Sequence, residues 1–190
     1  PFKTRDGGVL RLDDLIDIMN TAASKRLEEG GIGADFPDEE RTEIARKVGL
    51  AALKFADLQN QRLTNYVFDA ERFTAFEGKT GPYLLYAAVR IKSILRKAAN
   101  MGVKAGAITI SDTAEQQLVL SLDGFDRAVK SATEKFAPHL ICDHVYRLAQ
   151  SFSRFYTDCP ILAETTPDDV KASRLALADT TLRQLALGLH

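Results

Sequence analysis

Apolar residues recur every three to four positions along most of the chain, the spacing that gathers them on one face of an α-helix. The spacing predicts helices over residues 13–28, 37–58, 80–99, 118–122, 125–136, 139–158 and 166–190. Residues 59–78 have mixed periodicity, and positions 66–68 suit a short extended piece. No sustained alternation of apolar and polar residues follows Thr113, so we predict a mostly α fold, a helical bundle.

Residues that cap helices support two of these boundaries. Thr80 followed by Pro82 is a favourable helix start, because threonine can cap a helix and proline is tolerated in its first turn. Asp112 with Glu115 three positions later has the pattern of a capping box. We therefore expect helices to begin close to residues 80 and 112.

The composition is that of a globular protein. Of the 190 residues 45% are hydrophobic, which is ample for a core. No apolar run reaches about 18 residues and no secretion signal is visible, so we expect a cytoplasmic protein without a membrane partner. Cys142 and Cys159 are predicted to be thiols. The chain begins with Pro1 and ends at His190 inside an apolar helical pattern, so we expect a piece of a longer protein.

Charge is distributed unevenly along the chain. The net charge is −1, which alone argues against a nucleic-acid partner. Residues 13–43 contain ten acidic and three basic side chains. No acidic residue lies between Glu77 and Asp112, whereas six cations do: Lys79, Arg90, Lys92, Arg96, Lys97 and Lys104. The total charge therefore conceals a cationic segment.

The helix predicted over residues 80–99 carries the most informative pattern. Its spacing aligns two rings and two cations along one side: Tyr83, Tyr86, Arg90 and Lys97. Such a surface suits single-stranded nucleic acid, because bases stack on the rings and phosphates meet the charges. Half-buried tyrosines beside a solvated cationic face would give the same pattern, and both interpretations remain open.

Two weaker patterns lie in the helix predicted over residues 139–158. Arg147 and Tyr156 could both face a base or a phosphate, although a plain amphipathic helix looks the same. His139, Cys142 and His144 are close in sequence but would not share one helix face, so we predict no metal site. No histidine has a serine or cysteine partner in a nucleophilic motif.

Several stretches carry a resemblance to a known family. In chain order they are Pro1 to Gly8 with Leu12-Asp13-Asp14-Leu15-Ile16, Phe76 to Ala87 with Arg90-Ile91, Leu148-Ala149-Gln150, Phe155-Tyr156, Cys159-Pro160-Ile161-Leu162, and Ser173-Arg174-Leu175-Ala176-Leu177. Together they resemble the arginyl-tRNA synthetases, a class I family. The first stretch resembles the loop that replaces the KMSKS signature there, and the stretches from Phe76 onward resemble the family's DALR anticodon-binding domain. The block from Phe76 to Arg90 is the specific one.

The resemblance implies a function for the longer protein. That enzyme would be an arginine-tRNA ligase, which joins arginine to its tRNA with ATP and Mg²⁺ through an arginyl-adenylate. In it, Lys3, Thr4 and Arg5 would meet the ATP phosphates. Tyr86 and Arg90 correspond to contacts with anticodon-loop nucleotides, and Tyr156 to an aromatic on the facing helix. The piece itself is expected to bind tRNA, to hold no cofactor and to be inactive.

The resemblance also implies a division of the chain. Residues 1–8 would be a remnant of the catalytic domain, 9–75 a helical stem-contact region and 76–190 the DALR bundle. The expected partners are arginine tRNA and the absent N-terminal and catalytic domains of the same chain, and we expect a monomer. The alternatives are a helical protein-interaction module whose basic helix docks onto an acidic partner, and a paralogous synthetase that reuses the domain.

Overall fold

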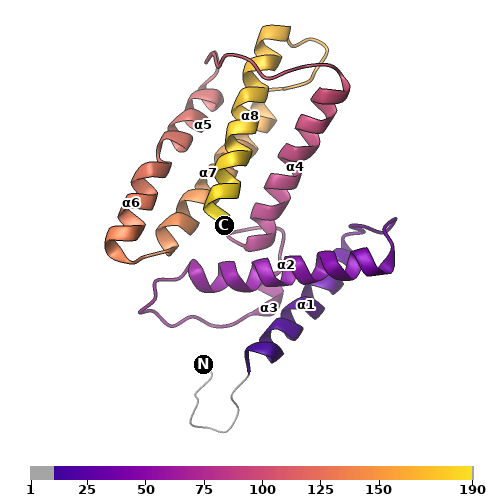
Figure 1. Cartoon of the computed structure of the whole chain (residues 1–190), viewed down its shortest axis with the longest axis vertical. Helices are drawn as coiled ribbons and strands as arrows, with labels where there is room; N and C mark the ends of the chain where they lie inside the picture. The colour runs from indigo at the N-terminus through magenta and orange to yellow at the C-terminus, as the bar shows by residue number, and fades with distance from the viewer. Residues whose placement is uncertain (1–10, 190) are drawn as a thin grey trace. The chain divides into compact units, whose positions relative to one another are not determined.

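The computed structural model describes residues 11–189, which fold into helices joined by turns and loops (Figure 1). This part of the chain contains no strand, so the prediction of a mostly α protein is confirmed. The chain divides into two compact units, Pro1–Leu85 (unit 1) and Tyr86–His190 (unit 2). The domain boundaries inferred from the sequence stay a prediction. None of the described helices is both long enough and apolar enough to cross a membrane.

Unit 1 is built on a close helix pair. It contains α1 (Leu12–Glu29), α2 (Asp38–Leu58), α3 (Ala70–Phe73) and the first turn of α4 (Gly81–Asn100). Helices α1 and α2 pack against each other, with Gly49 at a close contact between them. A Cβ atom on Gly49 would lie 2.9 Å from the carbonyl oxygen of Met19 and 2.7 Å from Oδ1 of Asn20. A buried apolar cluster of unit 1 comprises Met19 of α1, Ala52 and Ala56 of α2, and Phe73 of α3.

The helices predicted over residues 13–28 and 37–58 are confirmed to within one residue at each end. The structure differs from expectation between them and α4. Residues 66–68 form no strand; instead Phe68 packs its edge against Phe73 at a centroid distance of 5.6 Å. The short helix α3 follows, capped by the side chain of Asp69, which accepts a hydrogen bond from the backbone N–H of Arg72. This segment is held by aromatic packing and a helix cap, and not by the backbone hydrogen bonds that pair a strand with its neighbour.

Unit 2 is a helical bundle around α7. It contains the rest of α4 and α5 (Thr113–Asp123), α6 (Phe125–Lys135), α7 (His139–Asp158) and α8 (Asp168–Leu189). Helix α7 packs against α5, α6 and α8, and α5 also packs against α8. The apolar face of α7 is buried along its length and consists of Cys142, Val145, Leu148, Ala149, Phe152 and Phe155. The boundaries predicted for this helix are confirmed at both ends.

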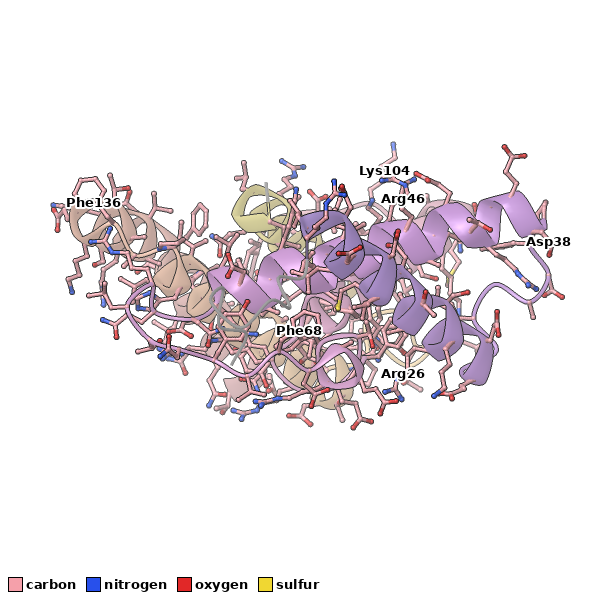
Figure 2. The ribbon with its side chains drawn as sticks, turned by 90° about the horizontal axis from the view of Figure 1, so that it is seen from below. Arg26, Asp38, Arg46, Phe68, Lys104 and Phe136 are labelled. Carbon is pink, nitrogen blue, oxygen red and sulfur yellow. The ribbon has the colours of Figure 1, made fainter. Side chains whose placement is uncertain are left out.

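The turn between α6 and α7 presents an exposed aromatic ring. Phe136 ends α6 in the left-handed region, with φ of 50°. Its ring is 73% exposed and stands clear of the ribbon in Figure 2. Bulky side chains rarely adopt positive φ, so the turn holds this residue in a strained backbone conformation.

The connector from α4 to α5 is tied to α8 although it has no regular structure. The N–H of Gly106 donates to the carbonyl of Ala172 at 3.0 Å. Ser173 Oγ accepts from the N–H of Thr109 at 2.9 Å and donates to its carbonyl at 3.0 Å. The connector ends in the predicted capping box: Asp112 caps α5, and the Glu115 carboxylate accepts from the N–H of Asp112. These bonds satisfy backbone groups that would otherwise lack partners.

Candidate nucleic-acid interface

Helix α4 carries two parallel stripes within unit 2. The first is apolar and buried: Ala87, Ile91, Ile94 and Ala98. The second lies one position earlier at each step and borders solvent: Tyr86, Arg90, Ser93 and Lys97. Burial of the first stripe fixes the rotation of the helix, and therefore the outward direction of the second. No acidic residue lies on α4.

Arg90 joins two tyrosines from different helices. Its Cζ atom lies 4.6 Å from the ring centroid of Tyr86 on α4 and 5.6 Å from that of Tyr156 on α7. Both distances are those of cation–π contacts. The rings are 45% and 42% exposed, so neither is sealed in the bundle. Within residues 11–189 no ion pair involves Arg90, and the guanidinium rests on rings rather than on a carboxylate.

The Tyr156 ring is supported from inside the bundle. It stacks with Phe152 one helical turn earlier, with centroids 6.3 Å apart and planes 17° apart. Phe152 is fully buried, so its ring is a fixed platform. The Tyr156 ring is therefore held in place before any ligand arrives.

A surface hollow of about 360 Å³ adjoins this cluster. Its walls come from α4, α7 and the turn after α7: Ser93, Ile94, Lys97, Tyr156, Pro160, Ile161 and Leu162. Ile161 is buried, whereas Lys97 is exposed. A ring face, apolar walls and a cation in one hollow suit a flat aromatic group that carries an anion, which is the chemistry of a nucleotide.

The structure brings four of the predicted site residues into one cluster: Tyr86, Arg90, Lys97 and Tyr156. Tyr83 lies in the first turn of α4, half-buried, and its N–H donates to Thr80 Oγ1 at 3.2 Å, which confirms the predicted cap. Lys3, Thr4 and Arg5 fall outside the described residues.

Arg147 lies apart from this cluster. It is nine positions before Tyr156, about two and a half helical turns, and so points to the opposite side of α7. There it lines a second hollow of about 380 Å³ with Arg127, Ser131 and His144. The spacing of nine residues on one helix is enough to predict that Arg147 and Tyr156 point to opposite sides of it.

Sequence reasoning missed part of the hollow. Ser93 could have been found, because it lies three positions after Arg90 on the same helix side. The wall from Pro160 to Leu162 carried no signal beyond the proline that ends α7. It enters the site only through tertiary packing.

The candidate metal ligands and the two cysteines are not part of the cluster around Arg90. Within residues 11–189 no group of three His, Cys, Asp or Glu side chains is arranged to hold a metal ion. Cys142 and Cys159 are both buried, and neither forms a disulfide within the described part of the chain. Burial raises the pKa of Cys159 to about 11, so this thiol stays protonated near neutral pH.

Comparison with protein families gives two matches that together cover most of the chain. Residues 84–190 match the DALR anticodon binding domain. Residues 1–70 match the catalytic domain of class I (R) tRNA synthetases. The DALR match spans more than half of the chain and includes the whole cluster around Arg90.

Individual relatives carry the same description. The chain is 57% identical over 188 residues to an arginine-tRNA ligase of Maricaulis maris, covering 99% of the chain and 32% of that protein. It is 57% identical over 190 residues to an arginine-tRNA ligase of Hyphomonas neptunium, covering 100% and 32%. The chain therefore spans about a third of the length of these relatives.

Solved structures agree at the level of the fold. The arginyl-tRNA synthetase of Thermus thermophilus superposes with a TM-score of 0.84 at 31% identity, covering 96% of this chain and 31% of that one. That of Plasmodium falciparum has a TM-score of 0.81 at 23% identity, covering 95% and 32%. The helical arrangement is thus shared with synthetases whose sequences have diverged widely.

Proposed function

Because the chain belongs to the arginyl-tRNA synthetase family and carries its DALR anticodon-binding domain, we propose that it is the part of an arginine-tRNA ligase that reads the anticodon of arginine tRNA. The observation that supports this most directly is the Arg90 guanidinium in contact with two half-exposed tyrosine rings beside the hollow. Unpaired bases stack on such rings, and each stacked base contributes about 1–3 kcal/mol.

Each residue of the cluster has a distinct role in this proposal. The rings of Tyr86 and Tyr156 stack with anticodon bases that leave the loop. Lys97 meets the neighbouring phosphate. Arg90 keeps positive charge at the rings and can itself stack with a base through its planar group. All arginine codons have G at the middle position, so the base read there is a cytosine.

The longer enzyme supplies the chemistry. It would attach arginine to tRNA with ATP and Mg²⁺ through an arginyl-adenylate, with Lys3, Thr4 and Arg5 at the ATP phosphates. Since the chain spans about a third of its relatives, we expect the isolated chain to bind arginine tRNA and to show no arginylation. Detectable arginylation by the purified chain would contradict this part.

The test compares two tRNAs. The chain is titrated with arginine tRNA and with the same tRNA whose middle anticodon cytosine is replaced. The readout is the dissociation constant for the altered tRNA divided by that for arginine tRNA, so a lower ratio means weaker discrimination. Tyr86→Ala and Tyr156→Ala should each weaken binding of arginine tRNA by roughly 5- to 150-fold, the loss of one stacked base, and should also lower this ratio. Lys92→Ala removes an exposed cation of the same helix and serves as the control, because it should weaken both tRNAs equally.

A second comparison separates the charge of Arg90 from its shape. Arg90→Lys keeps the cation but loses the planar group that lies on the rings. If Arg90 acts by stacking, Arg90→Lys lowers the ratio as far as Arg90→Met does, while only Arg90→Met changes the salt dependence of binding. A native chain that binds both tRNAs equally, or prefers an acidic protein, would overturn the proposed function in favour of a protein-interaction module.

A further inference from the structure

A buried carboxylate in unit 2 joins the start of α5 to α8. Glu115 on α5 is 1% exposed. Its Oε2 accepts hydrogen bonds from the backbone N–H groups of Ser111 at 2.8 Å and Asp112 at 3.1 Å. Its Oε1 accepts from Nε of Arg174 on α8 at 2.7 Å. A carboxylate with this many donors is paired and fully desolvated.

The same arginine reaches the turn after α7. Nη1 of Arg174 donates to the carbonyl oxygen of Pro160 at 2.8 Å. Thr166 Oγ1 donates to that oxygen at 3.2 Å, so both of its lone pairs are used. The Arg174 side chain is only 13% exposed, and its planar fork fixes the angle between its two partners. Glu115 therefore orients Arg174, and Arg174 holds Pro160.

Pro160 begins the wall of the hollow beside Tyr156. Proline has no N–H to donate, so the carbonyl of Pro160 is the backbone group through which Arg174 and Thr166 hold the chain at this point. Cys159 on one side and Ile161 on the other are buried, so a shift of the carbonyl would move the wall as a piece. The width of the hollow depends on where this carbonyl is held.

We propose that Arg174, oriented by Glu115, is a positioning residue that sets the wall from Pro160 to Leu162 and thereby the base selectivity of the interface. The inference rests on the proposed function, since it assigns selectivity to the same hollow. Arg174 is too deeply buried to meet RNA itself. It acts through the carbonyl of Pro160, and its loss widens the hollow without removing a ring or an exposed cation.

Ser173 offers a matched control one position away. It is also buried on α8, and its hydroxyl exchanges two hydrogen bonds with Thr109 in the connector. Ser173→Ala therefore loosens the bundle by removing buried hydrogen bonds, yet it leaves the bonds to Pro160 in place. A merely structural role of Arg174 would make the two variants alike.

The experiment measures the ratio of dissociation constants for arginine tRNA and the tRNA with a replaced middle anticodon base. All variants are compared at a temperature where circular dichroism shows them folded. Arg174→Met should lower the ratio by roughly 2- to 30-fold, the range for mutations that act at a distance from a ligand. Arg174→Lys should lower it as far, because one ammonium cannot hold both Glu115 and Pro160. Ser173→Ala should leave it unchanged.

A second variant keeps the inference testable if the arginine variants do not fold. Thr166→Val removes the uncharged donor to the Pro160 carbonyl and keeps the ion pair. It should lower the ratio by a smaller factor than Arg174→Met, with the affinity for the mismatched tRNA unchanged or higher.

The outcomes separate the two proposals. If the native chain does not discriminate between the tRNAs, the proposed function fails and this inference falls with it. If the native chain discriminates, and Arg174→Met or Thr166→Val discriminates equally well, the inference alone is wrong. Equal losses in Arg174→Met and Ser173→Ala would also overturn it, since they would reflect loosened packing rather than the wall.

Discussion

Two ion pairs of equal length lie in different surroundings in the two units. In unit 1, Nε of Arg46 is 2.7 Å from Oε2 of Glu43 on α2, and the side chains are 53% and 44% exposed (Figure 2 labels Arg46). In unit 2, Nε of Arg174 is 2.7 Å from Oε1 of Glu115, at 13% and 1% exposure. The first joins residues one turn apart, and the second joins helices 59 positions apart. Because the N–O distance is the same, exposure to water and separation in the sequence must decide how much each pair contributes to stability.

The largest expected effect comes from removing one carboxylate of each pair. Glu115→Ala should lower the free energy of unfolding of unit 2 by about 3–5 kcal/mol, because it leaves a buried guanidinium and two N–H groups without partners. Glu43→Ala should lower the stability of unit 1 only slightly, because solvent screens that pair. Urea titration followed by hydrogen exchange of α5 and α8, and separately of α1 and α2, reads each unit. Equal losses would remove the distinction between the pairs.

The next effect tests how helices α1 and α2 of unit 1 are held together. Replacing a glycine by alanine in a helix interior normally stabilises the helix by about 0.5–1 kcal/mol. In Gly49→Ala the added Cβ would meet the backbone of α1, so we expect this variant to be destabilised by about 1–3 kcal/mol instead. Gly124→Ala, at a helical φ of −70° with no neighbour closer than 3.4 Å, is the control and should be neutral or stabilising. The urea midpoints of the two variants measure the effect. A stabilised Gly49→Ala variant would show that α1 can move away from α2 to make room for the added Cβ.

A smaller effect appears on acidification. Burial raises the pKa of Glu115, but the N–H groups of Ser111 and Asp112 and the Arg174 guanidinium outweigh it, so the pKa lies below its usual value. The stability this carboxylate contributes is present above the unfolded pKa of about 4.3 and is lost as pH falls through the folded pKa. The difference in stability between the native chain and Glu115→Gln should therefore shrink as the pH is lowered from 5 towards 3.

The two ion pairs should respond differently to salt. The hydrogen bond from Arg46, helped by its charge, lowers the pKa of the exposed Glu43 to about 2. At about 1 M salt the Debye length is about 3 Å, so the contribution of Glu43 should largely disappear while that of Glu115 persists. Urea midpoints of Glu43→Gln and Glu115→Gln at low and high salt give the answer. Loss of both contributions in salt would show that the Glu115 pair is open to solvent.

The smallest effect is chemical. Cys159 is fully buried and has a raised pKa, so alkylation by iodoacetamide at pH 8 should be slow in the native chain and fast in urea. The Arg174 guanidinium lowers the pKa of this thiol and so partly opposes the effect of burial, so Arg174→Met should slow alkylation of Cys159 in the folded chain relative to Ser173→Ala. Mass spectrometry of the labelled peptide measures the rates. Equal rates in both variants would show that the thiol is not sensitive to this cluster.

The helices of this protein were predictable because their signals are local. Apolar periodicity and capping residues such as Thr80 and Asp112 act within a few positions, and the boundaries they predict agree with the structure. The segment around Phe68 was not predictable, because it is held by a ring contact with Phe73 and by a four-residue helix too short to leave a period.

The candidate site was predictable only along one helix. The alignment of Tyr86 with Arg90 follows from a spacing of four residues. The approach of Tyr156 to the same guanidinium, and of Arg174 to Glu115, depends on how helices pack across the bundle. The capping box indicated what one carboxylate oxygen of Glu115 would do, but nothing near it in sequence indicated the partner of the other.

The bonds that tie the α4–α5 connector to α8 bear on where the chain tolerates foreign sequence. An epitope or a fluorescent reporter placed near Thr109 would break the exchange with Ser173 and expose backbone groups that rely on it. The tip at Phe136 has an exposed ring and a strained backbone, so an added loop there would disturb few contacts and would relieve the strain. Of these two loops, the short one is the better place for a graft.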